Sequence, residues 1–302
     1  MSTIECVPNI SEGRRPEVIA ACADAVRASG AALLNVSADP SHNRTVLTFT
    51  GSADVVLAGV LALFAEAVRH IDLTQHTGGH PRVGAVDVTP FVPLGTTPMS
   101  ACITLARRAA AEVARRFDVP VFLYEEAASA PARRDLADIR RGQLDGLAAR
   151  MTDAAWQPDF GPARPHPTAG VAVIGARRPL IAYNVNLATD RLDVAVRIAA
   201  LVRERTGGMP GIKALGIALP DRGHVQVSLN VTDVRATSLY AVFTRVVEEA
   251  QREGVAVIDS EVVGLVPAAA LTATAARALR LTGFSDAQVL EYLLPTPEGW
   301  LL

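Results

Sequence analysis

The segment LIAYNVNLATDRLDVAVRIAALVRE, residues 180–204, decides the fold because it predicts a strand followed at once by a helix. Apolar and polar residues alternate over 180–187, as in a strand with one buried face, and a helical pattern follows over 191–204. Beyond it the sequence predicts strands at 214–219 and 225–231, a helix at 238–253 and a strand at 255–263. The second half of the chain therefore has the order βαββαβ.

The first half of the chain repeats this order. It predicts strands at 3–7, 31–37, 45–50 and 86–92, with helices at 16–28 and 52–72. The order βαββαβ is typical of ferredoxin-like sandwiches, in which helices cover one face of a mainly antiparallel sheet. We therefore predict an α+β protein made of two such α/β sandwich subdomains in tandem.

Additional chain lies between the two halves. A helix is predicted at 97–117 and a strand at 119–124, and an arginine-rich segment follows at 133–141. Prolines and glycines make DFGPARPHPTAG, residues 159–170, an irregular connector. We therefore place the domain boundary at residue 176, between domains of residues 1–176 and 177–302.

The composition is that of an ordinary globular protein. The 302 residues are 50% hydrophobic and 20% charged, and the formal net charge of −2 gives no reason to expect nucleic acid or a membrane surface as a partner. The three scattered cysteines, and an N-terminus without the apolar core of a signal peptide, predict a cytoplasmic protein. The longest apolar stretch, 55–65, is too short to span a bilayer.

The segment HTGGHPRVGAVDVTPFVP, residues 76–93, is the candidate catalytic loop. Gly78, Gly79 and Pro81 disfavour a helix, so His80 is predicted to stand in a loop that leads into a strand. Histidine can accept and donate a proton near neutral pH, which favours a general acid/base role for His80 over a turn-capping role. No metal is predicted, because the helix and glutamate of the familiar metalloprotease motif are absent.

Two further polar loops carry candidate site residues. In DPSHNRT, residues 39–45, Asp39, Asn43 and Arg44 fit either a turn or substrate contacts. Arg44 or Arg82 would bind substrate carboxylates through paired hydrogen bonds, and Asp39 or Asp87 would orient His80. In VPNISEGR, residues 7–14, the polar residues fit either a part of the site or simply the start of the following helix.

Seven blocks of sequence carry a family resemblance. They are ECVPNISEGR at 5–14, HNRTVLTFTG at 42–51, HTGGHPRVGAVDVTPFVP at 76–93, DVPVFLYEEA at 118–127, WQPDFGP at 156–162, ARRPLIAYNVNL at 176–187 and SEVVGLVP at 260–267. In this order, over nearly the whole chain, they resemble the glutamate formiminotransferase family.

The resemblance implies an enzyme of histidine degradation and one-carbon metabolism. It would transfer the formimino group from N-formimino-L-glutamate to N5 of tetrahydrofolate, its co-substrate, giving 5-formiminotetrahydrofolate and L-glutamate. The resemblance also implies a homodimer and a catalytic role for His80, with Asn184 and Asn186 as candidate substrate contacts. The family's folate-binding loop falls on Gly161, Pro162, Ala163, Arg164, Pro165, His166, Pro167, Thr168, Ala169 and Gly170.

The sequence departs from animal members of the family at three points. Animal members carry a fused cyclodeaminase domain, so we expect only the transferase activity here. They have aromatic residues in the folate loop, which this sequence lacks, and a glutamate where this sequence has Gly79. Two alternatives stay open: a glutamate formyltransferase that uses N-formylglutamate, and a folate-binding protein without catalytic activity.

Overall fold

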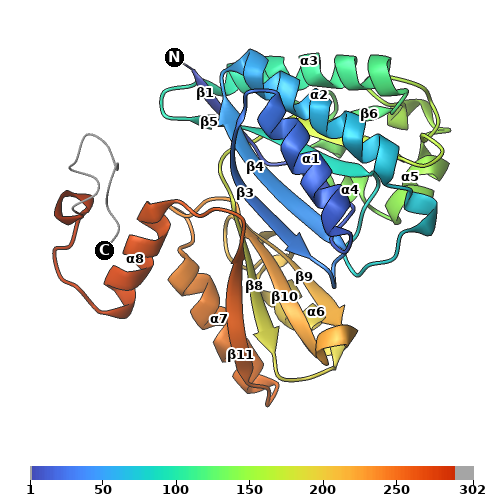
Figure 1. The fold of residues 1–302 in the computed structure, drawn as a ribbon. Helices are drawn as coiled ribbons and strands as arrows, with labels where there is room; N and C mark the ends of the chain where they lie inside the picture. The colour runs from blue at the N-terminus through green and yellow to red at the C-terminus, as the bar shows by residue number, and fades with distance from the viewer. Residues whose placement is uncertain (1, 290–302) are drawn as a thin grey trace. The chain divides into compact units, whose positions relative to one another are not determined.

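The computed structural model describes residues 2–289, which form two compact units (Figure 1). The first unit takes residues 2–179, 217–224 and 263–265, and the second takes the other described residues. The described strands form one sheet of seven strands and one of four, accompanied by helices. This arrangement confirms the predicted α+β class with two α/β subdomains.

Most of the first unit follows the predicted βαββαβ order. Its elements are β1 (Thr3–Cys6), β2 (Asn9–Ile10), α1 (Pro16–Ala28), β3 (Ala32–Asp39), β4 (Arg44–Gly51), α2 (Ala53–His70) and β5 (Val86–Leu94). β1 and β2 are successive parts of one interrupted strand, which lies antiparallel between β4 and β5. β3 pairs antiparallel with β4. The resulting order, β5, β1/β2, β4, β3, is that of a ferredoxin-like sheet.

Two parallel strands widen this sheet beyond β5. The additional elements are α3 (Met99–Phe117), β6 (Val121–Glu125) and β7 (Ala172–Ala176). β7 pairs parallel with β5 on one side and with β6 on the other. The sequence analysis missed β7, because its short apolar run shows no alternation and includes a glycine.

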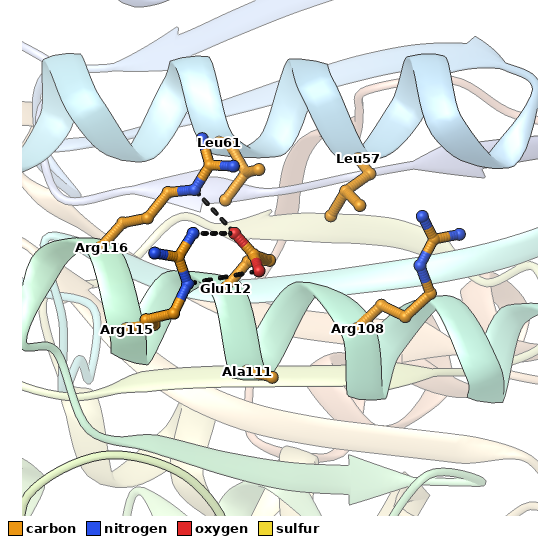
Figure 2. A pocket seen from close by; sticks show the side chains of 7 residues that line it. All are labelled: Leu57, Leu61, Arg108, Ala111, Glu112, Arg115 and Arg116. Atoms are coloured by element: carbon orange, nitrogen blue, oxygen red, sulfur yellow. Dashed lines mark hydrogen bonds and ion pairs between the residues drawn. The ribbon is translucent and has the colours of Figure 1, made fainter.

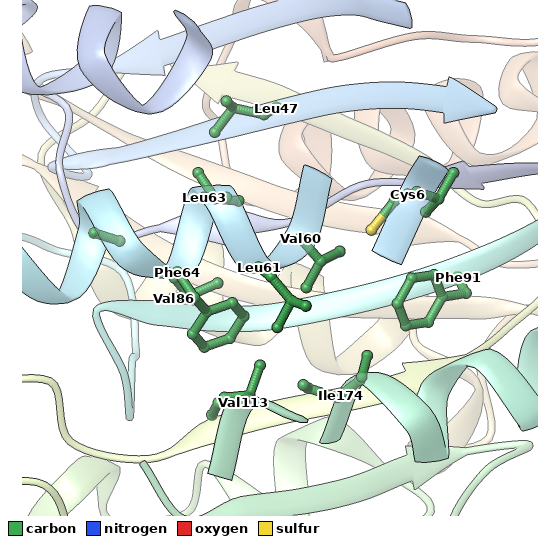
Figure 3. Close-up of a cluster of buried hydrophobic side chains, with 14 of the residues drawn as sticks. Cys6, Leu47, Val60, Leu61, Leu63, Phe64, Val86, Phe91, Val113 and Ile174 are labelled. Carbon is green, nitrogen blue, oxygen red and sulfur yellow. The ribbon is translucent and has the colours of Figure 1, made fainter. Parts of the chain in front are cut away.

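Apolar side chains fill the space between the helices and the sheet of the first unit. α1, α2 and α3 lie side by side on one face (Figure 1). Phe49, Phe64 and Phe91 are buried in the core of this unit, and Figure 3 shows Phe64 and Phe91 there. Burial of each such ring contributes about 1.5–3 kcal/mol. On the opposite face, α4 (Leu136–Ile139) and α5 (Gln143–Arg150) cover β6 and β7. These two helices lie in and beyond the segment predicted only as arginine-rich.

The second unit has the same order of elements. They are β8 (Ile181–Leu187), α6 (Leu192–Val202), β9 (Ile212–Leu219), β10 (His224–Val231), α7 (Leu239–Arg252), β11 (Val257–Val263) and the unpredicted α8 (Ala268–Ala278). The sheet order is β11, β8, β10, β9, again that of a ferredoxin-like sheet. Alternate residues of β8 and β10 pack against α6 and α7, as the period of two predicts.

Short 3-10 helices complete the described secondary structure. They lie at Leu73–Gln75, Pro131–Arg133, Ala154–Trp156, Glu204–Thr206, Pro220–Arg222 and Asp286–Gln288. None of the helices within residues 2–289 is long and apolar enough to cross a membrane.

Candidate active site

Three polar loops of the first unit meet through the side chain of Asn43. This residue has a left-handed backbone conformation, with a φ of 47°, and its side chain is buried. Its Oδ1 accepts a hydrogen bond from the Gly13 amide at 2.9 Å, and its Nδ2 donates to the Thr77 carbonyl at 2.9 Å. The predicted site residue Asn43 therefore joins the loops, and its amide group is occupied by backbone partners.

Two more side chains, those of Arg14 and Ser11, connect the same loops through hydrogen bonds. Arg14 Nε donates to the Pro40 carbonyl at 2.8 Å and its Nη1 donates to Thr77 Oγ1 at 3.2 Å. Ser11 Oγ donates to the Gly84 carbonyl at 2.7 Å. Polar residues of the first loop therefore position the loop that carries His80.

Gly78 fits between the neighbouring loops only because it has no side chain. A Cβ at Gly78 would lie 2.5 Å from the His42 carbonyl oxygen, whereas a Cβ at Gly79 would have no neighbour closer than 3.6 Å. We expect Gly78→Ala to displace the loop and to lower kcat/KM by about 10²-fold, since a shift of about 1 Å can cost that much. Gly79→Ala is the matched control and should stay near the wild-type rate. Equal effects of the two substitutions, in steady-state kinetics of folded protein, would contradict this role of Gly78.

His80 is held as a neutral ring in a defined tautomer. It is buried, with 9% of its surface exposed. Its Nδ1 lies 2.8 Å from the Pro81 carbonyl oxygen, which can only accept, so Nδ1 carries the proton. Its Nε2 lies 2.7 Å from Nη1 of Arg44, which can only donate, so Nε2 holds the lone pair. The ring is therefore oriented with its basic nitrogen toward Arg44.

The surroundings of His80 oppose its protonation. Burial, followed by the positive charges of Arg44 and Arg140, holds the pKa of His80 well below 6.5. The hydrogen bond to Pro81 acts in the opposite direction, and His42 lowers the pKa further. Burial also lowers the pKa of Arg44 to about 10, so this guanidinium stays charged near neutral pH. As arranged, the ring is neutral at physiological pH.

The neutral ring makes the fold sensitive to acid. Because the folded-state pKa of His80 lies well below the ordinary 6.5, the unfolded chain binds this proton first as the pH falls through about 6.5. This one group then removes up to about 1.4 kcal/mol of stability per pH unit, until the folded-state pKa is reached. We expect urea denaturation to show a steeper loss of stability below pH ~6.5 for wild type than for His80→Gln. Parallel curves would contradict a depressed pKa.

The predicted orienting carboxylates bond elsewhere. Asp87 is buried, accepts a hydrogen bond from the Val83 amide at 2.7 Å and forms an ion pair with Arg140. Asp39 Oδ1 accepts from the His42 amide at 2.8 Å. Neither carboxylate bonds to the ring, so the expectation that Asp39 or Asp87 orients His80 directly is corrected: the Pro81 carbonyl does so. Both carboxylates instead bond to backbone amides of the loops around the ring.

Sequence reasoning did not single out Arg140 as a functional residue. It follows α4, and its guanidinium reaches Asp87 on β5. The only signal in the sequence is the density of arginines at 133–141, which does not say which one points inward. The ion pair between Arg140 and Asp87 therefore depends on the tertiary fold.

Arg82 stabilises the loop through both terminal nitrogens of its guanidinium. Its Nη2 donates to the carbonyls of Gly78 at 2.7 Å and of His80 at 2.6 Å, and its Nη1 bonds to Nδ1 of His76. The other ring nitrogen of His76 bonds to the Asn43 carbonyl at 3.0 Å. Of the two arginines proposed to bind carboxylates, Arg82 is thus engaged with its own loop, whereas within residues 2–289 the Arg44 side chain bonds only to His80.

The predicted folate loop ends beside the histidine loop. The Ala169 carbonyl accepts from the Ala85 amide at 2.9 Å, and the Val171 amide donates to the Val83 carbonyl at 2.8 Å. Gly170 has a φ of 68°, and a Cβ there would lie 2.4 Å from the Val83 oxygen. The structure therefore brings the C-terminal end of this loop, residues 169–170, next to residues 83–85, which follow the His80 loop.

Within the predicted folate loop, His166 is the residue with an aromatic ring. His166 Nδ1 accepts a hydrogen bond from the Ala169 amide at 3.0 Å, which fixes the ring within the loop. Arg164 is exposed and lies 3.6 Å from Asp118. The loop thus offers backbone groups, one imidazole and one guanidinium to a folate, and it has no phenylalanine, tyrosine or tryptophan for pterin stacking.

Asn184 and Asn186 belong to a polar network on the second sheet. Asn184 Nδ2 donates to Glu261 at 3.1 Å and Asn186 Nδ2 donates to Asp259 at 2.6 Å. Gln226, which is fully buried, donates to Asn186 Oδ1 at 2.9 Å. Sequence reasoning missed Gln226, Asp259 and Glu261, although the alternation of β8 and β10 places Asn184, Asn186 and Gln226 on the face away from the apolar core.

A groove elsewhere in the described chain lacks the candidate catalytic residues. A groove of about 370 Å³ is lined by residues of α2 and α3 (Figure 2), but it contains none of the candidate site residues. Arg115 and Arg116 in this groove are both paired with Glu112. Within residues 2–289, no three His, Cys, Asp or Glu side chains lie close enough together to hold a metal ion.

Comparison with known families identifies the group of proteins to which the chain belongs. Residues 3–177 match the N-terminal subdomain of the formiminotransferase domain, and residues 182–284 match the formiminotransferase domain. The chain belongs to the formiminotransferase family. This confirms the resemblance seen in the seven sequence blocks, and membership makes the protein a transferase.

Stand-alone relatives match the formiminotransferase chain over almost their full length. It is 42% identical over 290 residues to the glutamate formimidoyltransferase of Streptococcus pyogenes, covering 95% of this chain and 97% of the relative. It is also 42% identical over 294 residues to that of Thermoplasma acidophilum, covering 96% and 97%. The mouse formimidoyltransferase-cyclodeaminase is 42% identical over 280 residues, but this chain covers only 52% of that protein.

Proposed function

We propose that this protein is a glutamate formimidoyltransferase of histidine degradation. It transfers the formimino group of N-formimino-L-glutamate to N5 of tetrahydrofolate, giving 5-formiminotetrahydrofolate and L-glutamate. The observation that carries the proposal is the buried, neutral His80, whose Nε2 keeps its lone pair and lies 2.7 Å from Nη1 of Arg44. The names of the stand-alone relatives support this choice of donor.

The proposed chemistry needs a base that can also act as an acid. N5 of tetrahydrofolate attacks the amidine carbon, and the new N5–C bond forms while Nε2 of His80 takes the proton from N5. The tetrahedral intermediate collapses when the imidazolium returns this proton to the glutamate nitrogen, and the bond between that nitrogen and the carbon breaks. The proton that leaves N5 therefore reaches the glutamate nitrogen through His80, and the reaction balances without a metal or a covalent enzyme intermediate.

The remaining candidate residues receive supporting roles in this proposal. Arg44 binds a carboxylate, residues 161–170 contact tetrahydrofolate, and Asn184 and Asn186 contact substrate. Asp39, Asn43, Arg82 and Asp87 hold the loops in place. In the same proposal, residues 1–176 are the subdomain that carries the histidine and folate loops, and residues 177–302 are the second formiminotransferase subdomain.

The test is a steady-state transfer assay with tetrahydrofolate and two donors offered separately. We expect product with N-formimino-L-glutamate and at most a trace with N-formyl-L-glutamate. Product from the formyl donor alone would make the protein a formyltransferase. No product from either donor, with tetrahydrofolate still bound, would make it a folate-binding protein without catalysis.

We also propose a cytoplasmic homodimer. Cys6, Cys22 and Cys102 are free and buried, as expected of a chain from a reducing compartment. Within the described residues β3 pairs only with β4, so it leaves a sheet edge on which a second copy can pair. Sedimentation equilibrium tests the dimer, and a single species of monomer mass across the concentration range would contradict it.

A further inference from the structure

The Arg44 guanidinium is hydrogen-bonded to Nε2 of His80, the ring nitrogen through which this histidine would accept a proton. Arg44 is the first residue of β4, and its Nη1 lies 2.7 Å from Nε2 of His80. The Nδ1 proton is bonded to the Pro81 carbonyl, so Nε2 is the only nitrogen of the ring that can accept a proton. In this arrangement the base is oriented correctly but blocked.

Among the described residues, no carboxylate forms an ion pair with Arg44. The carboxylate of Asp87 is paired with Arg140, and within residues 2–289 the Arg44 side chain bonds only to His80. Burial has the largest effect on the pKa of Arg44 and lowers it; Arg140 and Arg82 also lower it, whereas Asp87 and Asp39 raise it. Since neither carboxylate bonds to the Arg44 side chain, this half-buried guanidinium keeps N–H donors with which it can bind an anion.

We propose that Arg44 is a carboxylate-operated latch on His80, a proposal that rests on the transfer function proposed above. Without substrate, Nη1 of Arg44 covers Nε2 of His80. A substrate carboxylate then takes the guanidinium in a paired hydrogen bond, Arg44 leaves the ring, and Nε2 becomes free for the proton of N5. The base is thus released only when an acidic substrate is bound, so Arg44 couples recognition of the carboxylate to the start of proton transfer.

A carboxylate is a stronger hydrogen-bond partner for Arg44 than the neutral imidazole of His80. A guanidinium–carboxylate pair has two charge-assisted hydrogen bonds, whereas the guanidinium–imidazole contact has one, to a neutral acceptor. Withdrawal of the cation also removes one of the causes that lower the pKa of His80. The ring then becomes a better base at the moment it is needed, because efficient acid/base catalysis requires a pKa near the working pH.

In this proposal, the other side chains that lower the pKa of His80 keep their positions during the exchange. They are Arg140, which follows α4 and is fixed by Asp87, and His42 of the neighbouring loop, whose ring centroid lies 5.8 Å from that of His80. They and burial also lower the pKa of His80, so the departure of Arg44 removes only one of several causes. The latch therefore predicts a partial rise of this pKa.

Two sources can provide the carboxylate: the amino-acid donor and the glutamate tail of the folate. Titration of His80 by ¹⁵N NMR of the imidazole nitrogens distinguishes them. The pKa is measured in the free protein, with saturating L-glutamate, with tetrahydrofolate, and with tetrahydropteroate, which lacks the glutamate tail. A rise with L-glutamate assigns the latch to the donor. A rise with tetrahydrofolate but not with tetrahydropteroate assigns it to the tail.

The variant Arg44→Gln should raise the pKa of His80 in the free protein and should abolish the further rise with the carboxylate ligand. The matched control is Arg108→Gln, which removes a surface arginine of α3 that pairs with Asp54 and has no hydrogen bond to the ring. It should leave both pKa values near those of wild type. The titration of His80 in the wild-type protein, with and without ligands, tests the proposal by itself. The test therefore remains even if Arg44→Gln does not fold.

A pKa of His80 that does not change with saturating L-glutamate or tetrahydrofolate would overturn the latch. If the protein still transferred the formimino group, the proposed function would stand without it. If a carboxylate ligand raised the pKa but no transfer occurred, the latch would stand and the proposed function would fail. In an active enzyme, the acid limb of kcat should lie at higher pH than that of kcat/KM, and the two limbs should coincide in Arg44→Gln.

Discussion

His80→Ala is expected to lower kcat by about 10²–10⁴-fold, the range that general acid/base catalysis supplies. The substitution removes the nitrogen that takes the proton of N5, but it leaves the folate loop and its backbone hydrogen bonds to Val83 and Ala85 in place. The Kd for tetrahydrofolate should therefore stay within a few-fold of wild type. Transfer kinetics and equilibrium binding of tetrahydrofolate, measured on the same preparation, check both expectations.

The matched control for this substitution is His70→Ala. His70 ends α2 and pairs with Glu66 at 3.2 Å on the surface of the helix. Its removal should leave kcat unchanged. If His80→Ala and His70→Ala had the same kcat, or if His80→Ala lost tetrahydrofolate binding as completely as turnover, His80 would not be the catalytic residue.

Asp87→Ala is expected to have the largest effect on stability. The Asp87 and Arg140 side chains are only 2% and 13% exposed, so the substitution leaves a buried guanidinium without its partner. Breaking a buried ion pair in this way costs about 3–5 kcal/mol. The Val83 amide also loses its acceptor. Urea denaturation measures the loss as a lower midpoint with an unchanged slope.

Asp54→Ala is the surface control for that experiment. Asp54 pairs with Arg108 at 2.9 Å, but the two side chains are 83% and 50% exposed. An ion pair in this environment contributes little, and we expect a change within about 0.5 kcal/mol. A loss of stability for Asp87→Ala as small as for Asp54→Ala would contradict a structural role for the buried pair.

The parts of the fold that the sequence predicts are those with a clear local pattern. The alternation of Ile181, Tyr183, Val185 and Leu187 predicts β8, and the predicted helix at 16–28 has the bounds of α1. β7, with the sequence AVIGA, was missed because its short apolar run shows no alternation and includes a glycine, which is disfavoured in strands. β5 and β6 are also buried, but their valine and aromatic residues made them recognisable as strands.

The sequence predicts candidate site residues but not the hydrogen bonds between them. Gly78 and Pro81 made it clear that His80 stands in a loop, and polar residues gathered in neighbouring loops suggested a site. Which group orients the ring was not predictable, since a backbone carbonyl such as that of Pro81 leaves no mark in the sequence. The pairing of Asp87 with Arg140 joins residues 53 positions apart and needs the folded sheet.

The most direct test of the proposed function follows the labelled donor atoms into the product. N-formimino-L-glutamate carrying ¹³C at the amidine carbon and ¹⁵N at its imino nitrogen is mixed with tetrahydrofolate and enzyme, and the products are resolved by mass. Formimino transfer predicts that both labels appear together in 5-formiminotetrahydrofolate, and that unlabelled L-glutamate is released. Loss of ¹⁵N as ammonia with ¹³C alone on the folate, or no label on the folate at all, would contradict it.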